Sequence, residues 1–266
     1  MTLVNRLVPA PNDVAAVRQR ETALTPTLSI CAPAFNEEAA LERVVREWVA
    51  QIEAAGWDAE IVITDDGSTD GTAEILARLA AELPRLHVIS HSRNRGYGAG
   101  MRSAMAATSG DLLLTMDSDG QSALEDWEAL YAAMEAEELD VVTGYRHAKQ
   151  ASTVHVYADR MLNLLVRLSF GLRLRDTNCS MKLFRGEVGR EIADLGEAMG
   201  YAAPTEFLIK ARLLGYRVGE ARTTHLSRAG GTSKLKALQT SLDMGKFLLY
   251  LRMKQHLFKR HIISRM

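Results

Sequence analysis

Five apolar segments alternate with helical segments over residues 28–146, and this alternation constrains the fold more than any other feature. The apolar segments are 28–35, 59–66, 86–92, 111–117 and 139–146. Each is a continuous apolar run, which is typical of strands covered on both faces. The segments between them, at 36–56, 67–83, 96–110 and 124–138, have the composition of helices. The sequence therefore predicts an α/β fold with a mostly parallel sheet and helices on both faces.

Two features refine this prediction. The signals for the ends of a helix are clearest at 36–56, and the regular alternation of strands and helices stops after residue 150. Asn36 is a candidate N-cap and Gly56 a candidate helix end. Further along we expect a basic amphipathic helix at 156–175, a strand at 177–185, and a helix followed by a strand at 203–221. The last forty residues are basic and are expected to be helical.

The two halves of the chain carry opposite charge, although the net charge is only -1. Residues 1–145 contain 24 Asp and Glu against 10 Lys and Arg, whereas residues 146–266 contain 9 against 22. This asymmetry indicates different partners for the two halves. The chain has only two cysteines, which predicts a cytoplasmic protein without disulfides. It has no apolar leader and no apolar run of membrane-spanning length, so we expect no spanning helix.

Charged residues gather where the predicted strands end. In such sheets ligands bind beyond the carboxyl ends of the strands, so the residues at those ends should converge in one cleft. They are Pro33, Phe35, Asp66, Asp117, Asp119 and Arg146. Asp117 and Asp119, separated by Ser118, have the oxygen chemistry that Mg²⁺ or Mn²⁺ prefers. The same spacing also fits a polar turn at Gly120, and "DDGSTDGT" around Asp66 fits turn and cap chemistry.

Several other site classes are disfavoured by the sequence. The stretch "NRGYGAG" lacks the lysine of a P-loop, and no G-x-G-x-x-G follows the first strand, which argues against a dehydrogenase. Two cysteines without a Cys/His cluster argue against zinc. Basic residues are not interleaved with aromatic ones, so nucleic acid is not an expected partner.

Seven stretches over about residues 28–236 resemble glycosyltransferase family 2, which has the GT-A fold. The likeness is strongest to polyprenyl-phosphate sugar transferases such as dolichyl-phosphate mannosyltransferase and glucosyltransferase. The stretches are "APAFNEE", "VITDDGSTDGT", "NRGYGAGMRSAM", "MDSDGQ", "DTNCSMKLFR", "TEFLIKARLLGYRV" and "HLSRAGGTSK". The family usually has Gly and an aromatic residue where this chain has Ser180 and Met181, which leaves the sugar open.

The resemblance implies a role for each matching residue. The nucleotide base and ribose would lie against Pro33, Phe35, Glu37 and Asp66. The D-x-D metal site would comprise Asp117 and Asp119, with Gln121 nearby, and Asp119 is the stronger candidate for direct ligation of Mg²⁺ or Mn²⁺. Ser118, between the two carboxylates, would contact the donor. The donor phosphates would contact Arg146, Arg228 and Lys234, and the sugar and acceptor would lie by Asp176 and Glu206. Catalysis would depend on Asp119, Asp176, Glu206 and Arg228.

The implied reaction is an inverting, metal-dependent transfer of a sugar from a GDP- or UDP-linked donor to a polyprenyl phosphate. A phosphate nucleophile is already anionic and hardly needs a general base, whereas a sugar hydroxyl does. Basic amphipathic segments can lie on anionic lipid, so we expect peripheral contact with the cytoplasmic face of the membrane, with Arg160, Arg167 or Arg175 near the acceptor phosphate.

The predicted organisation has three parts: an N-terminal arm at 1–27, a GT-A domain at 28–236 and a basic C-terminal helical extension at 237–266. Two alternative functions stay open. One is a sugar-to-sugar transferase of surface polysaccharide or lipopolysaccharide synthesis. The other is a non-catalytic nucleotide-sugar-binding protein on the same fold.

Overall fold

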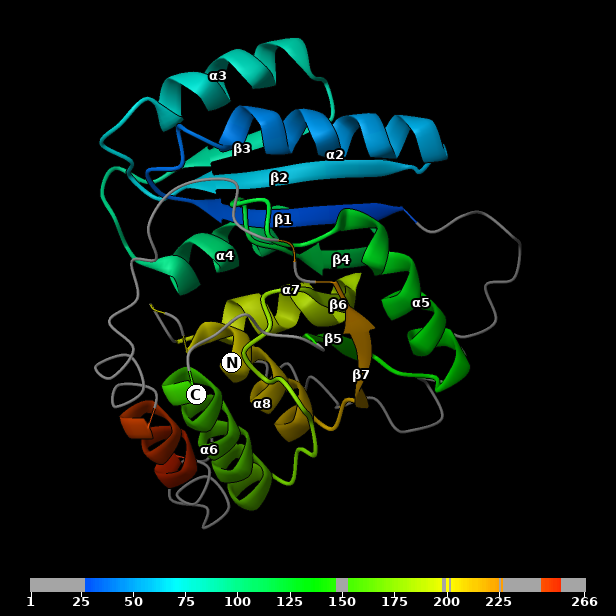
Figure 1. The fold of residues 1–266 in the computed structure, drawn as a ribbon, viewed down its shortest axis with the longest axis vertical. Helices are drawn as coiled ribbons and strands as arrows, with labels where there is room; N and C mark the ends of the chain where they lie inside the picture. The colour runs from blue at the N-terminus through cyan, green and yellow to red at the C-terminus, as the bar shows by residue number, and fades with distance from the viewer. Residues whose placement is uncertain are drawn as a thin grey trace, which may run out of the picture.

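The computed structural model describes residues 27–146, 153–197, 200, 202–224, 226 and 245–254. At its centre lies a seven-stranded sheet with the strand order β3-β2-β1-β4-β6-β5-β7 (Figure 1). The strands are β1 (Leu28–Ala34), β2 (Ala59–Asp65), β3 (Leu86–Ser90), β4 (Leu112–Thr115), β5 (Val141–Arg146), β6 (Lys182–Arg185) and β7 (Val218–Thr223). The helices are α2 (Leu41–Ala55), α3 (Thr72–Glu82), α4 (Tyr97–Ala106), η1 (Leu124–Asp126), α5 (Trp127–Ala136), α6 (Thr153–Phe170), α7 (Gly186–Leu195) and α8 (Ala203–Leu214).

The sheet is mostly parallel, as the sequence predicts. Leu28 of β1 lies opposite both Ala59 of β2 and Leu112 of β4, and both pairings are parallel. The β2–β3 and β5–β7 pairings are parallel as well. The exception is β6, which runs antiparallel between β4 and β5. The carboxyl ends of β1, β2, β4 and β5 therefore meet along one edge of the sheet.

Helices cover both faces of the sheet, because successive side chains of each strand point to opposite sides. Ile30 packs in a core cluster with residues of α2, α3 and α5. Its neighbour Cys31 packs in a second cluster with residues of α4, α6, α7 and α8 and with Leu248 and Leu251 of the helical segment 245–254. This arrangement explains why the central strands are apolar at nearly every position, and it confirms the predicted fold class.

The loop after β1 is longer than the sequence suggests. The helix begins at Leu41, and the prediction that Asn36 caps it is wrong. Asn36 instead has a left-handed φ of 54°. Its backbone N–H donates to Ser68 Oγ at 3.0 Å, and its Oδ1 accepts from the Thr69 N–H at 2.8 Å. Asn36 therefore joins the loops that follow β1 and β2, whereas Gly56 ends α2 as expected, with a φ of 68°.

The second half of the chain differs in detail from the prediction. The basic helix, α6, ends at Phe170 rather than near residue 175, and the strand expected at 177–185 is confined to Lys182–Arg185. Helix α7 was not predicted. Of the C-terminal extension, the structure describes residues 245–254, which are helical. No helix within the described ranges is long and apolar enough to cross a lipid bilayer.

Candidate functional site

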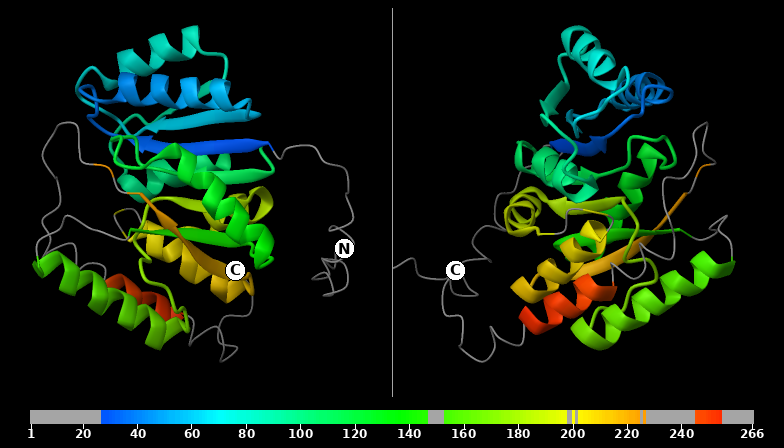
Figure 2. Two further views of the ribbon diagram at one scale, coloured as in Figure 1. Left: turned by 45° about the vertical axis from the view of Figure 1, so that its right-hand side comes forward. Right: turned by 90° about the vertical axis from the view of Figure 1, so that its left-hand side faces the viewer.

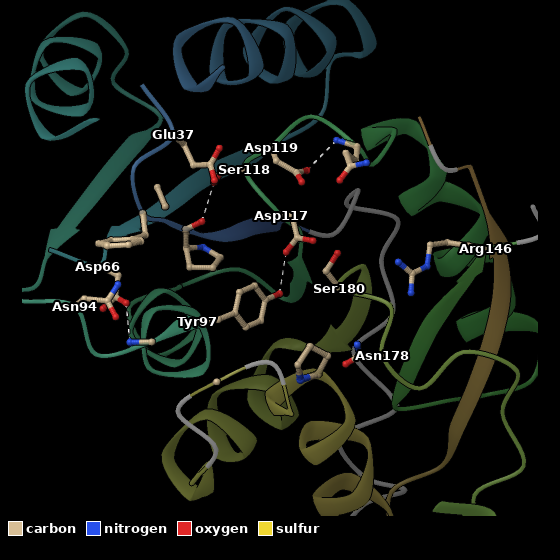
Figure 3. Close-up of a pocket in the computed structure, with 17 residues that line it drawn as sticks. Glu37, Asp66, Asn94, Tyr97, Asp117, Ser118, Asp119, Arg146, Asn178 and Ser180 are labelled. Atoms are coloured by element: carbon tan, nitrogen blue, oxygen red, sulfur yellow. Dashed lines mark hydrogen bonds between the residues drawn. The ribbon is translucent and has the colours of Figure 1, made fainter. Parts of the chain in front are cut away.

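A pocket of about 690 Å³ opens at the carboxyl edge of the sheet (Figure 3). The six residues predicted to converge there, at strand ends, all line it. They are joined by three neighbours that the sequence also singles out, Glu37, Ser118 and Gln121. The predicted convergence is therefore confirmed, while the role of each side chain stays a prediction.

Asp66, just past the end of β2, organises the loop that follows β3. Its side chain is 2% exposed. Oδ1 accepts from the Arg95 N–H at 2.9 Å and lies 2.6 Å from His91 Nδ1, and Oδ2 accepts from the Gly96 N–H at 2.8 Å. Gly67 permits this packing, because a Cβ there would lie 2.3 Å from the Arg93 backbone. Asp66 thus shapes the pocket wall that Asn94 and Gly96 form beside it.

The two carboxylates of the D-x-D stretch lie just beyond β4. Ser118 Oγ donates to the Pro33 carbonyl at 2.8 Å, which fixes the stretch to the end of β1. Asp119 Oδ1 accepts from the Gln121 N–H at 3.0 Å, across a turn that requires the left-handed φ of 76° at Gly120. Asp117 and Asp119 therefore face one pocket from a short, pinned segment.

The surroundings of Asp117 shift its pKa in opposing directions. Burial raises its pKa, the charge of Asp119 raises it further, and hydrogen bonds from Ser180 and Tyr97 act in the opposite direction. The Tyr97 hydroxyl donates to Asp117 Oδ1 at 2.9 Å (Figure 3). Two carboxylates that repel each other in this way form a site with affinity for a cation.

Three pocket residues in this region, Tyr97, Asn178 and Pro204, were given no role by sequence reasoning, whereas Ser180 was noted only as a departure from the family pattern. Tyr97 begins α4 within the glycine-rich stretch "NRGYGAG", and its place after β3 and in a family match were the available signals. Asn178 and Ser180 come from the connection before β6, and Pro204 comes from the start of α8. These segments carry no strand-end pattern, because they reach the pocket through the antiparallel part of the fold.

Arg146, at the end of β5, lines the pocket and is held by Asp176. Its Nε donates to Asp176 Oδ2 at 2.7 Å and its Nη2 to Oδ1 at 3.1 Å. The carboxylate is 4% exposed and the guanidinium side chain 24% exposed. Asp176 does not line the pocket, so it acts on the site by orienting Arg146.

The remaining predicted site residues lie elsewhere. Glu206 is fully buried in α8 and outside the pocket lining. Its Oε1 accepts from the Glu197 N–H at 2.8 Å and lies 3.1 Å from Lys210 Nζ. These contacts hold the α7–α8 connection, and none reaches the pocket. Arg228 and Lys234 lie outside the described residues, as does the arm before Thr27.

Beneath the site, β6 carries a fully buried lysine. Lys182 Nζ donates to the carbonyl oxygens of Thr177 at 3.4 Å and of Cys179, and to Thr143 Oγ1 at 3.2 Å. Burial lowers the pKa of Lys182 from 10.5 to about 8. Lys182 therefore holds the segment that presents Asn178 and Ser180 to the pocket.

This lysine gives stability an unusual pH dependence. Between pH 8 and 10 the unfolded chain keeps the proton that folded Lys182 loses, so the unfolded state binds more protons and stability rises with pH. We expect the free energy of unfolding of the wild type to increase by about 2–3 kcal/mol relative to Lys182→Met over this range. Urea titrations of both proteins at several pH values measure the difference. Parallel pH profiles would show that Lys182 does not titrate there.

The chain has the fold of two solved sugar-phosphoglycerate synthases. The chain superposes on glucosyl-3-phosphoglycerate synthase from Mycobacterium tuberculosis with a TM-score of 0.65 and 22% identity, covering 85% of this chain and 79% of that one. The TM-score to mannosyl-3-phosphoglycerate synthase from Rubrobacter xylanophilus is 0.63 at 18% identity, covering 91% and 77%. The chain therefore has the GT-A fold.

The family follows from the sequence match. Residues 29–192 match the model of glycosyl transferase family 2, and the chain belongs to that family. It is 32% identical over 209 residues to undecaprenyl-phosphate 4-deoxy-4-formamido-L-arabinose transferase of Salmonella gallinarum, and 31% identical to the Shewanella sediminis protein with the same name. These matches cover 78% of this chain, which spans about three fifths of the length of those relatives.

Proposed function

We propose that this protein transfers a sugar from a nucleotide-diphosphate sugar to a polyprenyl phosphate, with inversion and with a divalent cation. The observation that carries the proposal is the convergence of Asp117, Asp119 and Arg146 in one pocket. Such a site matches a diphosphate leaving group, whose charge needs a cation on one side and a guanidinium on the other. The curated relatives named undecaprenyl-phosphate transferases support the choice of acceptor.

The residues of the site fit a hard cation. Asp119 and Asp117 offer carboxylate oxygens, and the Gln121 side chain lies beside them in the pocket lining. The described residues contain no group of three or more His, Cys, Asp or Glu side chains arranged for a metal. A cation bound here would therefore complete its coordination with phosphate oxygens and water, as Mg²⁺ commonly does. When bound, it would neutralise charge on the departing diphosphate.

Each neighbouring residue then has a defined task. Tyr97 and Ser180 hold Asp117, and Ser118 ties the stretch to β1. Arg146, oriented by Asp176, places a permanent positive charge at the other wall of the pocket. Asp176 and Glu206 are both engaged in ion pairs, which favours an acceptor that needs no general base. A polyprenyl phosphate is such an acceptor.

A panel of nucleotides tests the donor half of the proposal. One structural neighbour contains Mn²⁺ and UDP, which makes this pair the first probe. We expect UDP or GDP to bind the full chain in the presence of Mn²⁺ and to lose most of its affinity in EDTA, whereas ATP binds weakly under both conditions. Isothermal titration calorimetry measures the affinities. Equal binding of all three nucleotides with and without the cation would refute a metal-dependent donor site.

A second surface supports contact with lipid. Helix α6 and the helical segment 245–254 lie side by side, packed on one core cluster (Figure 2). Together they present exposed apolar side chains, which we call the α6 apolar face: Met161, Leu164, Leu165, Leu168, Leu249 and Met253. The exposed Arg160 and Arg167 lie one turn or less from this stripe on α6. An apolar stripe bordered by arginines is the pattern of a helix that rests on an anionic membrane.

We expect Leu168→Glu to lower the affinity for vesicles of phosphatidylglycerol and phosphatidylcholine by about 10-fold or more. Leu168 is 72% exposed, so the change should leave stability intact while placing a negative charge in the α6 apolar face. Ala132→Glu adds the same charge on the exposed side of α5, across the sheet, and is the matched control. Vesicle sedimentation measures both. Equal losses in the two variants would point to net charge rather than to this face.

A further inference from the structure

The connection 175–180, which precedes β6, is anchored along its whole length. At its start, Asn163 of α6 donates from Nδ2 to the Arg175 carbonyl at 2.6 Å. The Oδ1 atom of Asn163 accepts from Thr177 Oγ1 at 2.7 Å and from the Thr177 N–H at 3.2 Å. At its end, Thr115 Oγ1 of β4 donates to the Ser180 carbonyl at 2.6 Å. Lys182 and Arg146 hold the residues between, so the connection is a fixed wall of the pocket.

Asn178 is the exception within this anchored segment. Its side chain lines the pocket, and its Oδ1 atom is buried without a hydrogen-bond partner in the described part of the chain. Because the backbone on both sides is pinned, the residue is held at this wall of the pocket. A buried acceptor left unpaired costs free energy, which a ligand can recover by donating to it.

The chemistry of this oxygen restricts the ligand. A carbonyl oxygen accepts a hydrogen bond and donates none. The diphosphate of the donor and an ionised acceptor phosphate carry acceptors only, so neither satisfies it. Among the groups of the two substrates, the partner must therefore bear an O–H or N–H. In Figure 3 Asp66 lies at the left of the pocket and Asn178 at the lower right. Asn178 is therefore distant from Asp66, which marks the predicted nucleotide end of the pocket.

We propose that Asn178 determines specificity by accepting a hydrogen bond from a hydroxyl or an amide N–H of the transferred sugar. The inference rests on the proposed function and adds which group of the substrate Asn178 recognises. Ser180, whose hydroxyl also lies in the pocket lining, stands beside it and is engaged with Asp117. A site that pairs with a substrate O–H or N–H discriminates against analogues lacking it, because its own acceptor is then left buried and unpaired.

Donor analogues test the assignment. The probes are UDP-glucose, UDP-galactose and UDP-N-acetylglucosamine, followed by the singly deoxygenated versions of the best donor and, for an acetamido sugar, the version without that group. In the wild type we expect one analogue to lose about 10- to 100-fold in kcat/KM relative to its parent. In Asn178→Ala that ratio should fall towards one, while the ratios for the other positions stay unchanged.

Two controls separate specificity from structure. Removing an unpaired buried acceptor should leave the Tm of ligand-free Asn178→Ala at or above that of the wild type. Asn163→Ala removes an anchor of the same connection, and it should lower turnover of all donors alike without changing any ratio. Asn178→Asp keeps an acceptor oxygen and should retain the discrimination better than Asn178→Ala does.

The outcomes distinguish this inference from the proposed function. Turnover by Asn178→Ala with every analogue ratio unchanged, or with all donors lowered equally, would overturn the role of Asn178 and leave the transferase proposal intact. Failure of the wild type to transfer sugar from any UDP- or GDP-linked donor would overturn both.

Discussion

Asp119→Asn is expected to weaken binding of the donor nucleotide about 100-fold in Mn²⁺ and to change it little in EDTA. The substitution keeps the size and position of a side chain that accepts from the Gln121 N–H but removes the charge that would bind the cation. Losing one group that stabilises the charge of a diphosphate typically costs 10²–10³ in rate, so turnover should fall at least as much.

Calorimetry with UDP, with Mn²⁺ and with EDTA, measures this difference. Asp58→Asn is the matched control, because Asp58 is exposed and precedes β2 at the opposite edge of the sheet. It should bind like the wild type under both conditions. If Asp119→Asn lost equal affinity with and without Mn²⁺, Asp119 would contact the nucleotide directly rather than through a cation.

The second large effect concerns Arg146. Arg146→Met removes the charge that faces the D-x-D stretch across the pocket, and we expect kcat/KM to fall by about 10²–10³. It also leaves the Asp176 carboxylate buried without its bidentate partner, which should lower the free energy of unfolding by about 3 kcal/mol. Arg146→Lys should recover only part of either loss, because an ammonium group cannot form the two-point pair.

The double variant Arg146→Met/Asp176→Asn separates the two losses. Removing both charges should restore most of the stability while activity stays low. Arg185→Met breaks an exposed pair with Glu135 and should change neither property measurably, which makes it the control for arginine removal. Urea denaturation and steady-state kinetics provide the readouts. Recovery of activity in the double variant would mean that Arg146 serves only to neutralise Asp176.

The parallel half of the fold was readable from the sequence for a physical reason. Strands buried on both faces must be apolar throughout, so β1, β2 and β4 stand out as continuous runs. Because their carboxyl ends meet at one edge of the sheet, the sequence alone predicted that Asp66 and Asp117 share one pocket. The predicted start of α2 was wrong because Asn36 forms hydrogen bonds with Ser68 and Thr69 instead of capping the helix. The helix therefore begins at Leu41.

The antiparallel part was much less predictable. Strand β6 has four residues and carries a buried lysine, which no hydrophobic pattern would assign to a central strand. Its insertion between β4 and β5 brings Asn178 and Ser180 to the pocket through long-range contacts rather than strand order. A match to a family motif did not place Glu206 correctly either, because Glu206 lies in a buried ion pair with Lys210, outside the pocket lining.

A transfer assay on the full chain is the most stringent test of the proposed sugar transfer to a lipid phosphate. The protein is incubated with a UDP- or GDP-sugar, Mn²⁺ and undecaprenyl phosphate, and the lipid product is analysed by mass spectrometry, with soluble oligosaccharides offered in parallel. We expect a sugar linked to the lipid phosphate with inverted anomeric configuration, and no product after chelation. Transfer only to the oligosaccharides, or lipid product formed equally well in EDTA, would contradict it.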